Sequence, residues 1–281
     1  MKQYCAETII EVVERLVGES HFSLEPQIQS LISTAALQEE DPFGRKVLNA
    51  IIENIAIASR DRIPMCQDTG MALIFFSLGI NASIDFCGYS SLQALADEGV
   101  RRASSSSYLR RSVVSPRERK NTGDNTPAIV WIESVPGDTL EIRSMIKGFG
   151  SENTTRLFML SPSSDESEII HCIVETVKKA GSNPCPPIFL GIGIGGTSEK
   201  ALLLSKEALF LTGESRACST SLLETRILQQ VNALGIGPGG LGGRYTCLDV
   251  RVKEFPTHIA GLPLAVSISC WAHRTAREVL S

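Results

Sequence analysis

The stretch Met65-Cys66-Gln67-Asp68-Thr69-Gly70, followed directly by the apolar run 71–80, is the feature around which the chain is organised. The continuous hydrophobicity of 71–78 predicts a buried strand, and the residues before it predict a loop. A thiol, an amide, a carboxylate and a turn-forming glycine stand together at positions 66–70. This density of ligand and proton-handling groups makes the loop the first candidate for a reaction centre.

The bulk composition excludes several classes of partner. The 281 residues are 43% hydrophobic, enough for a sizeable core, and the formal net charge is −4. A negative net charge gives no basis for binding nucleic acid or an anionic membrane. The N-terminus lacks the charged-then-apolar plan of a signal peptide, and the run 71–80 is too short to span a bilayer. We therefore expect a cytoplasmic protein with no nucleic-acid and no membrane partner.

Hydrophobic periodicity predicts an α/β (mixed α+β) fold: a helical N-terminal region, about 1–60, followed by mixed β-sheets flanked by helices. Strands are expected at 71–78, 127–133, 139–146, 188–192 and 248–255, and helices at 90–102, 166–180, 198–211 and 221–234. The strands 127–133 and 139–146 are expected to pair around the turn Pro136-Gly137-Asp138. The serine run 104–107 indicates a loop, and 258–270 a strand broken by Pro263. No internal repeat or long linker divides the chain, so residues 1–281 are expected to form a single domain.

The cysteines are scattered, which disfavours both a disulfide framework and a zinc ribbon. They are Cys5, Cys66, Cys87, Cys172, Cys185, Cys218, Cys247 and Cys270, and no two form a CxxC pair. Buried thiols, or a metal site assembled from distant positions, are the alternatives that remain. A buried, inert cysteine is the usual case, but the prolines around Cys185 fix its backbone, which suits a metal ligand.

Two further segments have competing interpretations. The glycine-rich turn 191–197 lies between a strand and a helix, but it lacks the GxGxxG spacing of a dinucleotide site. A carboxylate-binding turn or a purely structural one is expected there instead. The cations at 110–120 precede the loop 121–125, and they form either a solvated face or an anion-binding loop. His258 has no local signal for catalysis, and no GxSxG nucleophile elbow is present.

Several motifs together resemble one family, the α subunits of the iron–sulfur class I fumarases and L(+)-tartrate dehydratases. The matching stretches run in the family order and cover nearly the whole chain. They are Cys66–Gly70, Asn121–Pro127, Gly148–Asn153, Cys185–Pro187 with Ile194–Thr197, and Pro256–Cys270.

The resemblance implies a [4Fe–4S] cluster held by Cys66, Cys185 and Cys270. Three thiolates leave one open iron, which serves as a Lewis acid toward a substrate carboxylate and hydroxyl. The other cysteines are then structural.

The resemblance also implies site residues around the cluster. Gln67 and Asp68 match positions for substrate contact and proton handling, with Asp68 and His258 as the catalytic pair and His258 near the leaving hydroxyl. Arg110, or its neighbour Arg111, matches a carboxylate ligand. Substrate-binding positions in a backbone cradle correspond to Gly148, Gly150 and Asn153. Phe149 and Gly239 depart from the family pattern, where a glycine and a glutamine are expected.

Single-chain members of the family carry a second, C-terminal domain, and we expect no counterpart of it in this sequence. The resemblance therefore implies a separate β subunit that completes the active site, in an α2β2 assembly acting on a dicarboxylate. We expect reversible hydration of fumarate to malate, with tartrate dehydration as the alternative. A non-catalytic iron–sulfur binding or regulatory protein of the same fold, or a structural α/β protein with no cluster, are the alternatives from other classes.

Overall fold

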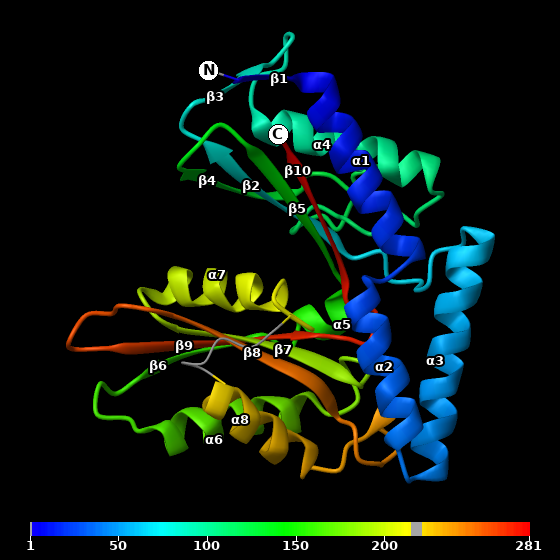
Figure 1. Ribbon diagram of the computed structural model, residues 1–281, viewed down its shortest axis with the longest axis vertical. Coiled ribbons are helices and arrows are strands. Elements are labelled where there is room, and N and C mark those ends of the chain that lie inside the picture. Colours follow the sequence, from blue (N-terminus) through cyan, green and yellow to red (C-terminus); the bar gives the residue numbers. More distant parts are fainter. Residues whose placement is uncertain (1, 215–220) are drawn as a thin grey trace. The chain divides into compact units, whose positions relative to one another are not determined.

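The computed structural model describes residues 2–214 and 221–281, and in this part of the chain helices combine with mixed sheets (Figure 1). The α/β prediction is confirmed. Two compact units are formed: unit 1 comprises Met1–Glu25, Asn54–Gly148 and Arg274–Ser281, and unit 2 comprises Pro26–Glu53 and Phe149–His273. Among the residues described, no helix is long and apolar enough to cross a membrane.

Unit 1 contains a mixed sheet with helices on one face (Figure 1). The strand order is β10 (Arg274–Leu280), β5 (Leu140–Lys147), β2 (Met71–Gly79) and β4 (Ile129–Val135). Helices α1 (Ala6–Phe22) and α4 (Leu92–Ser106) cover the face to which Ala72, Ile74 and Phe76 of β2 contribute. The short strands β1 (Lys2–Cys5) and β3 (Ala82–Asp85) pair in parallel beside them.

Three predicted details of the fold are wrong. Strands β4 and β5 do not pair with each other, because β2 lies between them, parallel to β4 and antiparallel to β5. The serine run 104–107 is not a loop: it ends α4, where Ser104 is buried and its hydroxyl accepts a hydrogen bond from Asn125 Nδ2 at 3.2 Å. Pro263 does not interrupt its strand, since it pairs opposite Met159 of the edge strand β6.

Unit 2 is a sheet covered on both faces, in the strand order β6 (Arg156–Leu160), β9 (Leu262–Ser269), β7 (Ile188–Gly195) and β8 (Cys247–Phe255). Helix α7 (Ser198–Leu209) lies on one face, and α6 (Glu166–Ala180) and α8 (Ser221–Asn232) lie on the other (Figure 1). The unit also contains α2 (Pro26–Gln38), α5 (Phe149–Glu152) and a 3₁₀ turn, Pro238–Gly240. Helix α3 (Pro42–Asp61) belongs to unit 2 up to Glu53 and to unit 1 from Asn54.

The glycines of β7 have a structural purpose. A Cβ on Gly193 would lie 2.0 Å from the carbonyl oxygen of Ala201, and one on Gly191 would lie 2.1 Å from that of Ser205. Both carbonyls belong to α7, so the glycines let this helix pack directly against the strand. The segment 191–197 was expected to be either a carboxylate-binding turn or a purely structural one. The structural role accounts for Gly191 and Gly193.

Strand direction gathers the predicted motifs at one end of each sheet. In unit 1 the start of β2, the end of β5 and the start of β10 adjoin, since Met71 pairs with Lys147 and Arg274 with Ile146. In unit 2 the start of β7 lies beside the end of β9, because Phe189 pairs with Ser269. The loops that carry Cys66, Cys185 and Cys270 all adjoin these strand ends.

Candidate active site

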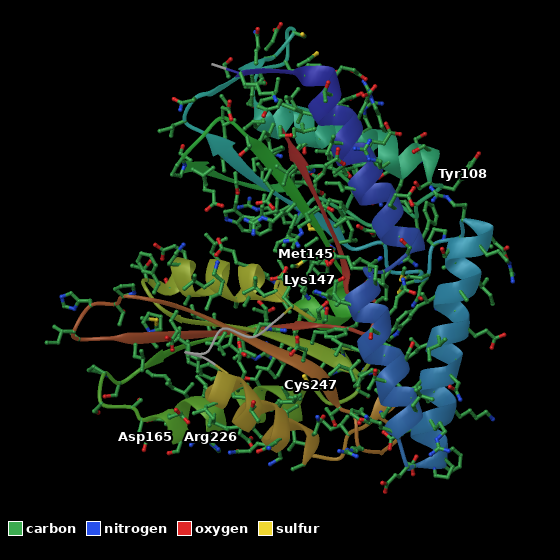
Figure 2. All side chains as sticks on the ribbon, in the orientation of Figure 1. Tyr108, Met145, Lys147, Asp165, Arg226 and Cys247 are labelled. Atoms are coloured by element: carbon green, nitrogen blue, oxygen red, sulfur yellow. The ribbon has the colours of Figure 1, made fainter. Side chains whose placement is uncertain are left out.

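The loop Cys66–Gly70 turns sharply before it enters β2. Gly70 has φ +61°, and a Cβ there would lie 2.5 Å from the carbonyl oxygen of Lys147, so a larger residue would collide with β5. The Gly70 N–H donates to Asp68 Oδ1 at 2.9 Å, which forms an Asx turn. Lys147, at the end of β5, is itself buried (Figure 2). This turn fixes one oxygen of the Asp68 carboxylate against the backbone.

Groups from distant parts of unit 1 hold the remaining backbone of the loop. Asn54 Nδ2 donates to the Met65 carbonyl at 2.9 Å, and the Met65 N–H donates to the His21 carbonyl at 2.9 Å. Arg274 Nη1 donates to the carbonyl of Asp68 at 2.8 Å. The loop is therefore clamped from both sides by residues that are remote in sequence.

His21 is a buried neutral imidazole beneath this loop. Its Nε2 lies 3.4 Å from the carbonyl oxygen of Thr69, and its Nδ1 lies 2.8 Å from that of Val17. Burial, with a smaller contribution from the positive charge of Arg274, lowers the pKa of His21 to about 4. At neutral pH the ring packs under the loop without adding a charge.

Arg110 is tied to the same loop through its backbone. Its carbonyl accepts hydrogen bonds from Thr69 Oγ1 at 2.6 Å and from Asn125 Nδ2 at 3.2 Å. Asn125 is buried, with φ +64°, and its Oδ1 accepts the Ser112 N–H at 2.8 Å. The motif 121–127 thus places the Arg110 backbone beside Thr69, while the Arg110 and Arg111 side chains are exposed.

Gly148 completes this corner of unit 1. A Cβ at Gly148 would lie 3.0 Å from Asp68 Oδ2 and 3.3 Å from Arg274 Nη2. The absence of a side chain therefore leaves room for both the carboxylate and the guanidinium. Unit 1 brings together Cys66, Gln67, Asp68 and Gly148, with the Arg110 backbone beside them.

Cys185 and Cys270 come together in unit 2. Cys185 has φ +55° and an exposed side chain, and its carbonyl lies 3.5 Å from the Trp271 N–H, the residue after Cys270. The Sγ atoms lie 4.0 Å from the Asn183 carbonyl for Cys185 and 3.7 Å from the Ala272 carbonyl for Cys270. The third predicted ligand, Cys66, is partly exposed and belongs to unit 1.

The donor chemistry of these three positions fits an iron–sulfur cluster. All three are thiols outside disulfides, and each side chain is at least partly accessible. Thiolates are the usual cluster ligands. Over residues 2–214 and 221–281 no three Cys, His, Asp or Glu side chains form a preassembled metal-binding group. Cys247, by contrast, is buried in β8 with its Sγ 3.2 Å from the Asp249 carbonyl, while Cys218 lies outside the described residues.

A glycine-rich segment, 235–245, packs against the residues on either side of Cys185. This role was not predicted from the sequence. The Gly239 N–H donates to the Pro186 carbonyl at 2.8 Å. A Cβ on Gly240 would lie 2.4 Å from the Cβ of Ser182. The segment is held in turn by the buried carboxylate of Glu39, which accepts the N–H groups of Arg244 and Tyr245 at 2.9 and 3.2 Å.

Gly150 and Asn153 line a polar cavity of about 350 Å³ in unit 2. A Cβ on Gly150 would lie 3.1 Å from the Asn183 carbonyl, two residues before Cys185. The cavity is also lined by Arg156, Lys179 and Asn183, with Thr154, Thr176 and Ala180. These residues offer cationic and amide donors for an anion. Nearby, Glu152 pairs with Lys206, and burial lowers the pKa of that lysine.

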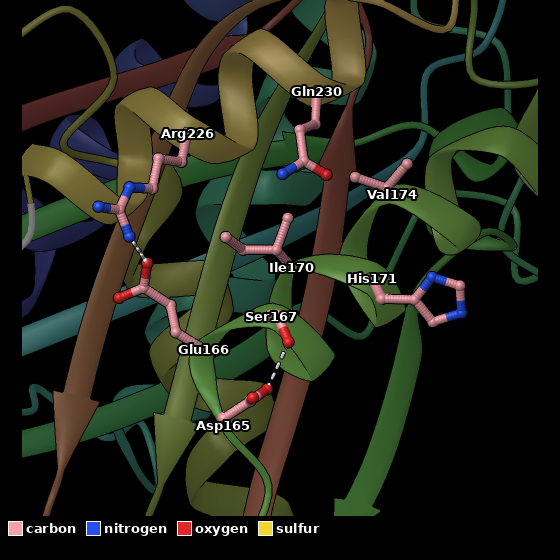
Figure 3. A pocket seen from close by; sticks show the side chains of 8 residues that line it. All are labelled: Asp165, Glu166, Ser167, Ile170, His171, Val174, Arg226 and Gln230. Atoms are coloured by element: carbon pink, nitrogen blue, oxygen red, sulfur yellow. Dashed lines mark hydrogen bonds and ion pairs between the residues drawn. The ribbon is translucent and has the colours of Figure 1, made fainter.

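A larger cavity of about 520 Å³ lies between α6 and α8, where Glu166 pairs with Arg226 and Ser167 donates to Asp165 at 2.6 Å (Figure 3). Its remaining lining residues are Ile170, His171, Val174 and Gln230. No predicted site residue lines it. We therefore place the candidate site at the strand ends and not in this cavity.

His258 lies apart from the two cysteines of unit 2. It is exposed in the connection between β8 and β9, where the Ala260 N–H donates to its Nδ1 at 3.2 Å. Strand β9, of 8 residues, separates it from Cys270 by roughly 27 Å along the strand. The structure therefore does not bring His258 to Cys270 within this chain, and its catalytic role stays a prediction.

The chain is similar to a group of known proteins over nearly its full length. The family model described as "Fumarate hydratase (Fumerase)" matches residues 10–279. The "Putative L(+)-tartrate dehydratase subunit alpha" of Methanocaldococcus jannaschii is 38% identical over 275 residues, covering 95% of this chain and 96% of that protein. The "L(+)-tartrate dehydratase subunit alpha" of Escherichia coli strain K12 is 27% identical over 279 residues, covering 97% and 91%.

Proposed function

The chain belongs to the Fumarate hydratase (Fumerase) family, and on that premise we propose that it is the α subunit of a hydro-lyase for a four-carbon hydroxydicarboxylate. The support comes from the corner of unit 1 where the Asp68 carboxylate meets Gly148, in a loop that begins with Cys66 and is fixed by backbone hydrogen bonds. A reactive carboxylate held beside a potential metal ligand is the arrangement that a dehydration needs.

Cys66, Cys185 and Cys270 would hold a [4Fe–4S] cluster with one open iron. Such a cluster, when bound, supplies a Lewis acid that makes hydroxide a workable leaving group. The family comprises iron–sulfur enzymes in general, and the thiols at these positions fit that chemistry. Cys247 pairs with Ile188 at the start of β7, but its side chain is buried.

The chain's own residues would bind the substrate and move a proton. The Gly70 N–H donates to Asp68 Oδ1, and Oδ2 lies beside Gly148; we assign proton handling to this carboxylate. The Arg110 guanidinium can bind a substrate carboxylate in a bidentate manner. Gln67 adds an amide for substrate contact. The proposal gives His258 no proton-transfer step in this chain, because β9 separates it from Cys270.

Gly150 and Asn153 would provide the second part of the substrate-binding surface. They line the cavity of about 350 Å³ together with Arg156 and Lys179. Cationic and amide groups in a concave surface suit a carboxylate. Cys185 follows Asn183, another lining residue of that cavity, by two positions.

We place L(+)-tartrate ahead of malate as the substrate. The related α subunits carry the tartrate dehydratase name, which favours the alternative over the fumarate–malate preference drawn from the motifs. Malate and fumarate remain the second candidate, because the family description names fumarate hydratase. The two hydroxy acids differ by one hydroxyl, and a site that hydrogen-bonds this hydroxyl can discriminate strongly.

The relatives are named α subunits, which implies a β subunit partner. We propose that this partner completes the active site of an α2β2 assembly. It would supply further cationic groups and part of the proton chemistry.

The decisive experiment is anaerobic reconstitution of the chain with its β subunit, followed by assays of L(+)-tartrate, malate and fumarate. We expect turnover of tartrate and a visible iron–sulfur absorbance. Cys185→Ser should remove the absorbance and lower kcat by more than ~100-fold, beyond the usual loss of an outer-shell partner. Cys172→Ser is the matched control, because Cys172 is a partly buried thiol of α6 outside the site.

Two outcomes would contradict the proposal. A reconstituted complex that stays colourless would remove the cluster. A coloured complex that turns over none of the three acids would favour a non-enzymatic iron–sulfur binding protein.

A further inference from the structure

Arg274 is a buried charge that the proposed chemistry does not use. It begins β10, at the end of the unit 1 sheet that carries the Cys66–Gly70 loop, and only 1% of its surface is exposed. Burial of a guanidinium opposes folding unless hydrogen bonds satisfy its N–H groups. Its contacts therefore show what the buried charge does.

The guanidinium is directed at the reactive loop. Nη1 donates to the Asp68 carbonyl at 2.8 Å, and Nη2 lies 3.3 Å from the Cβ position of Gly148. Nε is buried and has no hydrogen-bond partner among the residues that the structure describes. The charge is thus incompletely satisfied, and its one hydrogen bond to a carbonyl goes to the residue whose side chain we assign to proton handling.

The carbonyl that Arg274 holds belongs to the same turn as the Asp68 carboxylate. The Asp68 carbonyl belongs to the peptide unit between residues 68 and 69, and the Gly70 N–H belongs to the next peptide unit. This N–H donates to Asp68 Oδ1 at 2.9 Å. A rotation of the Asp68–Thr69 peptide would break the bond from Arg274 and disturb the turn that directs Oδ2 toward Gly148. A guanidinium N–H that restrains the carbonyl therefore also restrains the carboxylate.

We propose that Arg274 is a positioning residue that orients Asp68 by holding its backbone carbonyl. This inference rests on the proposed function in assigning Asp68 to the reaction. Arg274 acts through Asp68 and not through contact with the substrate.

The test compares Arg274→Met, Arg274→Lys and the control Arg277→Met, an exposed arginine of the same strand, in the complex with the β subunit. Methionine removes the buried charge at similar length, so the urea midpoint should stay level or rise. Kcat on tartrate or malate should nevertheless fall by about 100-fold with KM within about threefold, the scale of a small misplacement of a catalytic group. Lysine should recover part of kcat, since its ammonium can still donate to the Asp68 carbonyl.

Amide hydrogen exchange separates positioning from a structural role and from failure of the proposed function. We expect faster exchange at Gly70 in Arg274→Met than in wild type and Arg277→Met, with the iron–sulfur absorbance retained. This measurement needs no turnover, so it tests the positioning even if none of the assayed acids is a substrate. Unchanged exchange at Gly70, or a kcat that falls only in step with the urea midpoint, would overturn the proposal.

Discussion

The two units hold their cysteine-bearing segments by different means. In unit 1 the loop around Cys66 is held by side chains that come from distant elements: Asn54, His21 and Arg274 all contact its backbone. In unit 2 the segment around Cys185 is held by backbone groups, through the Gly239 N–H on Pro186 and the Trp271 N–H on Cys185. Side chains make most of these contacts in the first segment, where Gly70 also packs against the Lys147 carbonyl, and main-chain groups make most of them in the second.

This difference predicts different responses to mutation. A side-chain clamp can be weakened one hydrogen bond at a time, each contributing about 1 kcal/mol. A segment packed against main chain has no room for an added atom, so a single methyl group produces strain. In unit 2 the buried carboxylate of Glu39 is a distant side chain that also holds the glycine-rich segment.

Glu39→Ala tests whether unit 2 depends on that one side chain. The carboxylate accepts the N–H groups of Asp41, Arg244 and Tyr245, and alanine would leave them without this acceptor. We expect the free energy of unfolding to fall by about 4 kcal/mol, since each orphaned buried donor costs about 1–3 kcal/mol. Glu39→Gln keeps one carbonyl oxygen and should lose less than half as much. Urea unfolding measures both, and equal stability of Glu39→Ala and wild type would show that backbone contacts suffice.

His21 offers a pH test of the clamp in unit 1. The pKa of its imidazole is about 4 in the folded chain, because the ring is buried and faces Arg274, against an ordinary value of 6.5 when unfolded. Between pH 4 and pH 6.5 the imidazole is protonated in the unfolded chain and neutral in the folded chain. The stability that the neutral buried His21 contributes is therefore complete above pH 6.5, and it is lost as the pH falls toward 4. The loss should reach about 3 kcal/mol.

The measurement is urea unfolding of wild type and His21→Gln from pH 7 to pH 4. The variant should show a flatter dependence, because glutamine does not titrate. His171→Gln replaces an exposed histidine of α6 and should keep the wild-type dependence. A His21→Gln variant with the full wild-type slope would place the pH sensitivity elsewhere.

The sequence predicts those parts of the fold and site that depend on neighbours along the chain. The helices at the N-terminus, the strand at 71–78 and the helix at 166–180 follow from local periodicity. The prolines beside Cys185 and the glycine at position 70 likewise predict rigid turns from local sequence alone. The pairing of 127–133 with 139–146 was wrong because the turn signal is local, whereas the insertion of β2 between the strands is decided by its long-range burial.

The clamp residues could not be predicted, because nothing near them in sequence marks their role. Arg274 and His21 are 206 and 48 positions away from the loop residues that they contact. Only the adjacency of strand ends brings them to Asp68 and Thr69. His258 is a different case: a motif match suggested a shared site with Cys270, β9 lies between the two within this chain, and the catalytic role of His258 stays a prediction. Residues that are near or far in the sequence form one site only where the strand order brings them together.

Gly240→Ala, compared with Gly242→Ala, tests how tightly the glycine-rich segment of unit 2 is packed. Both glycines have left-handed backbones, with φ +73° and +90°. A Cβ at Gly240 would lie 2.4 Å from the Cβ of Ser182, whereas one at Gly242 would meet nothing within 4 Å. Gly242→Ala should therefore lose only the backbone strain, about 1 kcal/mol. Gly240→Ala adds a collision against the segment that leads to Cys185, for a total of about 2 kcal/mol.

The same pair separates packing from conformational preference at the candidate metal ligand. If main-chain packing positions Cys185, Gly240→Ala should also lower the iron bound after reconstitution, while Gly242→Ala should bind as much as wild type. The two variants share a residue type, a substitution and a backbone region, so a difference between them arises from the contact with Ser182. Equal losses of stability and of bound iron would mean that backbone strain alone governs the segment.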